Sequence, residues 1–269
     1  MDKTTTANTP TNIHKVQTVV VVGLGEVGKP LAELISKDHK VIGVDISPPA
    51  EDVSGVDVLH ICFPFQIKDF IGESARYIKI FRPELTVVNS TVAVGTTRRI
   101  AERAGAAVAY SPVRGKHARM LQDMQKYTKF VGALDPAAAG NAARHFESVG
   151  LKTKILSSPE AAEVAKLSET TFFGLMIAWA QEVERYADRA GVQYDEIVSF
   201  YQEIGFFPQV STFPGSLAAT VSCPISNCCG SLMTRKSLKL SSLRTRKRSI
   251  AMIKGKVRTP HVYEDPCSN

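Results

Sequence analysis

From Val16 onward, short apolar runs alternate with amphipathic stretches along the chain. The first run, Val16–Val22, is rich in β-branched residues and is typical of a strand buried on both faces. Further strands are predicted at Val41–Val44, Val56–Cys62, Leu85–Asn89, Ala106–Tyr110, Lys129–Ala133 and Lys152–Leu156. Helices are predicted between them at Leu31–Ile35, Ile67–Phe81, Thr96–Ala104 and Pro136–Val149. This alternation predicts an α/β fold with a Rossmann-type, doubly wound parallel sheet.

A long helix is predicted after the last of these strands. Ser158-Pro159-Glu160 is a strong start signal, and the helical pattern continues until Gly191. Roughly thirty helical residues span about 45 Å, which exceeds the diameter of a small domain. We therefore expect this helix to link two lobes or to pack on a partner subunit, with one more short helix over Asp195–Glu203.

The basic charge of the chain lies in its last part. The formal net charge is +7, but residues 216–269 hold 10 of the 33 lysines and arginines and only 2 of the 26 acidic residues. The preceding part is nearly neutral, which argues against nucleic-acid binding by the predicted sheet domain. No apolar run is long enough to cross a bilayer, and Met1–Thr6 lacks the apolar core of a signal peptide. We therefore expect a soluble, cytoplasmic protein.

A glycine turn follows the first predicted strand. In Gly23-Leu24-Gly25-Glu26-Val27-Gly28, the first glycine permits a tight turn and Gly25 lets the backbone approach a pyrophosphate at the helix N-terminus. Gly28 allows close packing of the helix on the strand. Because the turn joins a strand to a helix, it predicts a dinucleotide site that includes Glu26 and Val27.

An acidic residue lies at the end of the next predicted strand. Asp45 comes 22 residues after Gly23, where its carboxylate can accept hydrogen bonds from both ribose hydroxyls of the adenosine. The carboxylate would repel a 2′-phosphate, and no arginine follows in Ile46–Pro49. The sequence therefore favours NAD over NADP as the cofactor.

Three segments resemble the UDP-glucose/GDP-mannose dehydrogenase family. Gly23–Ala32 resembles the opening of that family, including Pro30 within the first helix, a residue that helices usually avoid. Asn89–Ile100 contains Ser-Thr-Val-Ala-Val-Gly-Thr-Thr, which is similar to the family's S-T-V-x-x-G-T-T motif. Glu163–Phe172 resembles E-x-x-K-L-x-x-N-x-F at the start of the family's central helix. The likeness extends over Val16–Phe200.

The resemblance implies an activity and roles for particular residues. Members of the family oxidise the C6 alcohol of a nucleotide sugar to a carboxylate in two hydride transfers to NAD, and a cysteine thiolate captures the aldehyde. Ser90 and Thr91 would lie near the nicotinamide and the catalytic water. Lys166 would contact the sugar and stabilise negative charge on its C6 oxygen, and Thr170 would share its helix face. In this family the long helix also forms the dimer contact, so a homodimer is implied.

Two segments depart from the family pattern. Thr170 replaces the family's helix asparagine, so no amide is offered there. The family's N-P-E-F-L loop reads Ser-Pro-Val-Arg-Gly-Lys-His over residues 111–117, with no carboxylate at the matching place. Arg114, Lys116 and His117 would instead form a basic lip suited to a phosphate or carboxylate of the substrate, although they could equally be solvated loop charges.

The expected G-G-x-C motif with the nucleophilic cysteine is absent from residues 216–269. Read across their eight junctions, with each triplet starting at the last base of one codon, the codons of Leu217–Ile225 can encode G-G-H-C-V-M-P-N. We therefore hypothesise that the reading frame slips near Gly215 and that the chain is incomplete and inactive. Cys223 has neither the family's surroundings nor zinc-ligand spacing, so no metal site is predicted.

The predicted organisation is an arm over 1–15, an NAD-binding Rossmann domain over 16–157, a helical connector and dimerisation region over 158–215, and a non-native or disordered tail over 216–269. Three alternatives stay open. The chain could be a dehydrogenase of the 3-hydroxyacid or 6-phosphogluconate type, a non-catalytic NAD-binding and dimerising module, or a protein whose basic tail binds nucleic acid. Cys62 is interpreted as an inert core thiol and His60 as a satisfied strand-end histidine, and neither is given a role.

Overall fold

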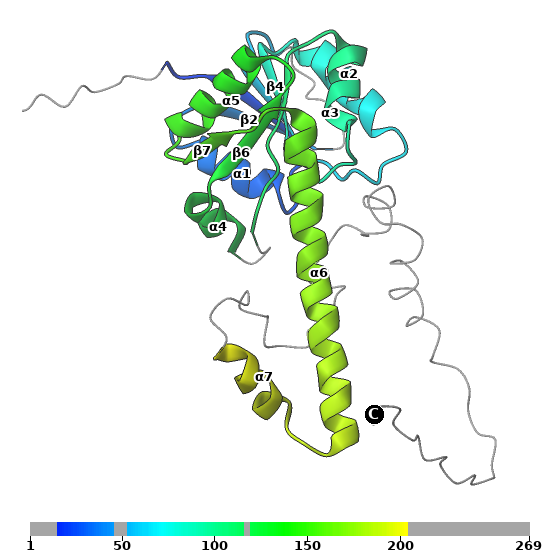
Figure 1. Cartoon of the computed structure of the whole chain (residues 1–269). Coiled ribbons are helices and arrows are strands. Elements are labelled where there is room, and N and C mark those ends of the chain that lie inside the picture. The colour runs from blue at the N-terminus through cyan, green and yellow to red at the C-terminus, as the bar shows by residue number, and fades with distance from the viewer. Residues whose placement is uncertain (1–14, 46–52, 116–118, 204–269) are drawn as a thin grey trace, which may run out of the picture. The chain divides into compact units, whose positions relative to one another are not determined.

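A computed structural model of the chain describes residues 15–45, 53–115 and 119–203 (Figure 1). The strands are β1 (Thr18–Val22), β2 (Lys40–Val44), β3 (Val58–Ile61), β4 (Leu85–Val88), β5 (Val108–Tyr110), β6 (Lys129–Ala133) and β7 (Thr153–Ile155). The helices are α1 (Gly28–Ile35), α2 (Phe70–Phe81), α3 (Thr96–Ala104), α4 (Met120–Lys126), α5 (Pro136–Ser148), α6 (Pro159–Ala190) and α7 (Tyr194–Gln202). The arm over 1–14, the tail after Gly215, Lys116 and His117 lie outside the described residues.

The strands form one sheet in the order β2-β1-β3-β4-β5-β6-β7. The predicted Rossmann-type α/β fold is confirmed, and the neighbouring strands are parallel except at one pair. There, β6 runs antiparallel to β5, with Tyr110 opposite Gly132. The chain leaves β5, forms α4, and enters β6 from the same edge of the sheet. As a result Lys129, the first residue of β6, lies at the edge where β1 to β5 end.

Both faces of the sheet are covered by helices (Figure 1). Val19 and Val21 of β1 belong to a core shared with α1, α4 and α5. Val20 and Val22 belong to a second core, shared with α2, α3 and the start of α6. Successive side chains of a strand point to opposite faces, so an unbroken valine run is what a strand between two apolar layers requires.

Helix ends follow the local sequence. The Ser158 hydroxyl accepts a hydrogen bond from Ala161 N at 3.1 Å, Pro159 lies in the first turn of α6, and Gly191 ends the helix with φ +68°. Helix α2 begins later than the periodicity predicts, because the Asp69 carboxylate accepts from Gly72 N at 2.8 Å and caps it. No helix among the described residues is long and apolar enough to span a membrane.

Candidate functional site

The carboxyl ends of the parallel strands meet at one edge of the sheet, where β2 lies on one side of β1 and β3 on the other. Ligands of open α/β sheets bind at such a switch in strand order. The structure places the glycine turn there directly after β1, Asp45 directly after β2, and Ser90 and Thr91 after β4. These predicted cofactor residues therefore share one edge of the sheet, here called the nucleotide edge.

The three glycines of the turn differ in their surroundings. Gly23 has φ +90°, and a Cβ added there would lie 2.6 Å from the backbone N of Phe63. A Cβ on Gly28 would lie 1.8 Å from the Gly23 carbonyl oxygen. At Gly25, by contrast, no heavy atom of the described residues lies within 4 Å of the added Cβ. Gly23 and Gly28 are thus required by packing, whereas Gly25 borders open space that a ligand could fill.

The N-terminus of α1 adjoins this open space. Its N-cap is Val27, and no side chain of the described residues forms a capping hydrogen bond there. Uncapped backbone amides and the positive end of the helix dipole favour an anion at this position. The turn and α1 together therefore fit the phosphates of a dinucleotide.

Ser90 and Thr91 follow β4 at the nucleotide edge. The Ser90 hydroxyl is buried and donates to the Phe63 carbonyl oxygen at 2.6 Å, so it ties the end of β4 to the end of β3. Thr91 is half-buried. The hydroxyl of Ser90 therefore has a structural partner already.

Glu163 joins two of the segments on which the family resemblance rests. Its carboxylate accepts from Gly95 N at 2.6 Å, from Thr97 N at 2.9 Å and from the Thr97 hydroxyl at 2.7 Å. The residue is fully buried, and burial raises the pKa of Glu163, while these hydrogen bonds oppose that rise. Helix α3 is thus capped by a carboxylate of α6, a role that the sequence reading did not assign.

Lys166 lies one turn beyond Glu163 on α6. Its ammonium is 3.6 Å from the Glu169 carboxylate, and the Arg114 guanidinium is 2.7 Å from the same carboxylate. Two of the four predicted substrate residues, Arg114 and Lys166, are therefore brought together by Glu169, to which the sequence assigned no role. The Thr170 hydroxyl donates to the Lys166 carbonyl oxygen at 2.9 Å, within the helix.

A buried chain of polar side chains runs from the nucleotide edge into the core. Lys129 donates to Asn89 Oδ1 at 3.3 Å, Asn89 Nδ2 lies 3.0 Å from His60 Nδ1, and His60 Nε2 lies 2.9 Å from His145 Nε2. His145 Nδ1 in turn contacts Gln17 Oε1 at 2.7 Å. The sequence predicted a satisfied strand-end histidine at His60, and the structure places it in β3 with partners on both ring nitrogens. The other members of the chain were not predicted.

Burial changes the acidity of these groups. It lowers the pKa of His60 well below its ordinary value and that of His145 to about 3. It also lowers the pKa of Lys129 to about 7, with Cys62 opposing and Lys166 adding to the shift. Burial raises the pKa of the Cys62 thiol to about 12, so this thiol is not a nucleophile at neutral pH.

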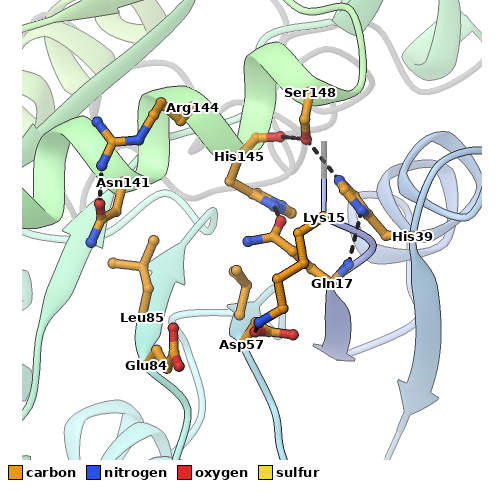
Figure 2. A pocket seen from close by; sticks show the side chains of 11 residues that line it. Lys15, Gln17, His39, Asp57, Glu84, Leu85, Asn141, Arg144, His145 and Ser148 are labelled. Atoms are coloured by element: carbon orange, nitrogen blue, oxygen red, sulfur yellow. Dashed lines mark hydrogen bonds and ion pairs between the residues drawn. The ribbon is translucent and has the colours of Figure 1, made fainter. Parts of the chain in front are cut away.

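A cavity of about 280 Å³ lies at the opposite edge of the sheet (Figure 2). It is lined by residues that precede strands, such as Gln17 and Asp57, and by the last turns of α5 around His145. Because dinucleotides bind outside the carboxyl ends of strands, this cavity is not the predicted cofactor site. Across the described residues, no group of three or more His, Cys, Asp or Glu side chains is placed to hold a metal ion.

Comparison with known proteins finds that the chain is similar to dehydrogenases. No family model matches it. It is 26% identical over 242 residues to the NDP-N-acetyl-D-galactosaminuronic acid dehydrogenase of Ralstonia nicotianae, an alignment that covers 68% of this chain and 57% of that protein. Its homologues are nucleotide-sugar dehydrogenases. The chain thus spans just over half the length of this relative.

Two solved structures show the same fold at lower identity. A UDP-glucose dehydrogenase from Pyrobaculum islandicum matches 88% of this chain and 69% of its own, with a TM-score of 0.69 and 21% identity. A 3-hydroxyisobutyrate dehydrogenase from Mycobacterium tuberculosis matches 87% of this chain and 90% of its own, with a TM-score of 0.63 and 18% identity. The Rossmann-type fold is therefore shared by dehydrogenases of two kinds.

Proposed function

We propose that this chain is the NAD-binding part of a nucleotide-sugar dehydrogenase, whose complete reaction converts the C6 alcohol of a UDP- or GDP-sugar to a carboxylate. The open space at Gly25, next to the uncapped N-terminus of α1, carries the proposal. NAD would accept the hydride removed from the sugar alcohol. Backbone amides of the turn from Gly23 to Gly28 would bind its pyrophosphate, and Asp45 would accept hydrogen bonds from the adenosine ribose.

The proposed substrate residues belong to α6 and to the segment that follows β5 in the sequence. Lys166 would stabilise negative charge that develops on the sugar oxygen, with Thr91 and Thr170 as the neighbouring hydroxyls. Arg114 would bind an anionic group of the substrate, and Lys116 and His117 would extend the same basic lip. Glu169 holds Arg114 and Lys166 before substrate arrives, so an anionic substrate would compete with this carboxylate.

The first experiment is a calorimetric titration of the chain with NADH and with NADPH. We expect NADH to bind and NADPH to bind at least about tenfold more weakly, because Asp45 would repel the 2′-phosphate. The variant Gly25→Val should lose NADH binding while its unfolding curve stays unchanged, since its side chain would occupy the open space. Gly28→Ala is the contrasting variant, because it should destabilise the fold through its contact with Gly23. NADH binding by Gly25→Val at unchanged affinity would contradict the proposed site.

We further propose that the chain does not complete the oxidation, because residues 216–269 carry no G-G-x-C motif. The codons of Leu217–Ile225 can encode G-G-H-C-V-M-P-N in the shifted frame. Sequencing the gene through the codon of Gly215 tests this. We expect the shifted frame to continue openly beyond that motif into a second α/β domain. A stop codon soon after the motif in the shifted frame would refute the frame slip and favour a non-catalytic NAD-binding module.

A dehydrogenase of the 3-hydroxyacid or 6-phosphogluconate type remains the second candidate, because such enzymes also combine a glycine turn with a helix lysine such as Lys166. The segment from Ser90 to Thr97 favours the nucleotide-sugar class. Turnover of simple hydroxyacids, with NADH formation followed by absorbance, would favour the second candidate instead.

A further inference from the structure

Lys129 is a buried lysine at the start of β6. The sequence analysis assigned no role to it. Only 4% of its surface is exposed. Removing an ammonium from water is costly unless hydrogen bonds and nearby charges compensate for the loss of hydration. A lysine buried at this position therefore needs partners that compensate its ammonium for the lost hydration.

Its partners match an ammonium group. Lys129 Nζ donates to the Ser111 carbonyl oxygen at 2.7 Å, to the Pro112 carbonyl oxygen at 3.3 Å and to Asn89 Oδ1 at 3.3 Å. An ammonium has three N–H donors for these three acceptors, whereas a neutral amine has two. The ring of Phe146, with its centroid 4.8 Å from Nζ, adds a cation–π contact.

The ammonium fixes the direction of every hydrogen bond in the chain beyond it. Since Asn89 Oδ1 accepts from Lys129, its Nδ2 donates, and it reaches both the Val87 carbonyl oxygen at 3.1 Å and His60 Nδ1. His60 must then carry its proton on Nε2 and donate to His145 Nε2. By the same reasoning His145 donates from Nδ1 to Gln17 Oε1, beside the cavity (Figure 2).

The acceptors of Lys129 belong to two segments of the proposed site. Asn89 immediately precedes Ser90 and Thr91 at the end of β4. Ser111 and Pro112 begin the loop that carries Arg114. One ammonium therefore connects the proposed cofactor residues after β4 with the proposed substrate residue after β5.

We propose that Lys129 is a positioning residue of the nucleotide edge, whose ammonium holds the end of β4 and the loop after β5 in the arrangement that binds the dinucleotide. This inference rests on the proposed function. It deepens that function by adding a residue that contacts neither cofactor nor substrate.

The proposal predicts a pH dependence of binding. Among the described residues, four titratable groups face Lys129. They are His60 of β3, Cys62 directly after that strand, His145 of α5 and Lys166 of α6. The pKa of Lys129 is about 7, whereas those of His60 and His145 lie well below and that of Cys62 far above. When Lys129 loses its proton it must release one of three acceptors, so NADH affinity should fall as the pH rises through about 7.

The test compares the full chain with Lys129→Met, Lys129→Arg and the matched control Lys152→Met, which changes an exposed lysine. NADH dissociation constants are measured by calorimetry at pH 6.0 and pH 8.5. We expect the unchanged chain and Lys152→Met to bind about tenfold more weakly at the higher pH. Lys129→Met should bind weakly at both, and Lys129→Arg should bind at both without the pH dependence, because arginine stays protonated.

A second measurement does not depend on nucleotide. Without the ammonium, the loop after β5 loses two of the hydrogen bonds that hold its start, so trypsin should cleave Lys129→Met after Arg114 several-fold faster than it cleaves Lys152→Met. NADH binding by Lys129→Met with unchanged affinity and pH dependence would overturn the inference, and so would equal cleavage rates. If Lys129→Met does not fold, a pH-independent NADH affinity of the unchanged chain overturns it. Absence of NADH binding by the unchanged chain at both pH values would instead refute the proposed function, and this inference with it.

Discussion

At the scale of single residues, Glu163 links the start of α6 to the N-terminus of α3, 66 residues earlier in the chain. Its buried carboxylate accepts three hydrogen bonds from the N-terminus of α3, where the helix dipole also favours negative charge. Lys166 follows one turn later on the same helix. The position of Lys166 relative to Ser90 and Thr91 therefore depends on the hydrogen bonds of Glu163.

Replacing Glu163 by glutamine tests this arrangement. The amide nitrogen of Glu163→Gln would face a backbone N–H, so one buried donor would lose its acceptor. We expect the free energy of unfolding to fall by about 2 kcal/mol, as measured by urea denaturation. Glu160→Gln is the control. Glu160 pairs with the exposed Arg98, so this substitution should lower the free energy of unfolding by less than about 1 kcal/mol. Equal losses in the two variants would contradict the assignment.

At the scale of elements, the direction of β6 decides what lies at the nucleotide edge. The sequence predicted the strand over Lys129–Ala133 but gave no sign of its antiparallel direction, because its pattern is the same either way. In a parallel strand the side chain of Lys129 would lie at the opposite edge. Pairing with β5 instead brings it to Asn89, His60 and the rest of the buried polar chain.

The two neutral histidines of this chain, on β3 and α5, predict an acid-sensitive fold. Burial depresses the pKa of His60 and of His145 in the folded state, so below pH about 6.5 the unfolded chain binds protons that the folded chain does not. The contribution of these two histidines to stability should therefore be complete above that pH and fall below it, by about 1.4 kcal/mol per pH unit for each histidine. For His145 the loss should continue to a pH of about 3.

Urea denaturation at pH 7.5, 6.5 and 5.5 measures this dependence. The variant His145→Gln keeps a side chain that can hydrogen-bond but removes one titrating group. Between pH 6.5 and 5.5 its stability should fall with about half the slope of the unchanged chain. The same slope in both proteins would mean that His145 titrates alike in the folded and unfolded states, contrary to its burial.

At the scale of the whole molecule, α6 carries an exposed apolar stripe. Phe172, Leu175, Trp179 and Tyr186 are each about half exposed. Their spacing places them on one face of the helix. Contiguous apolar side chains of this size on a surface are typical of an interaction site. We propose that the stripe is the contact of a homodimer, as the resemblance to the nucleotide-sugar dehydrogenases implies.

The substitution Trp179→Glu tests the dimer. A carboxylate in the middle of the stripe should weaken dimerisation by at least about thirtyfold, because a buried tryptophan is typically a dominant contact of an interface. Light scattering coupled to size-exclusion chromatography gives the mass as the concentration is lowered. Asp188→Lys, on the opposite face of α6, should leave the mass unchanged. A monomeric mass for the unchanged chain at high concentration would refute the dimer.

The sequence by itself determined the elements, the fold class and the glycine turn, because each follows from a pattern of residues that are close together in the chain. The valine run of β1, the capping residues of α6 and the spacing of the glycines at 23, 25 and 28 can each be recognised within a short stretch of sequence. The tertiary structure alone decided the direction of β6, the capping of α3 by Glu163 and the burial of Lys129. These depend on contacts between residues far apart in sequence, where a lone lysine or glutamate looks the same whether it is solvated or buried.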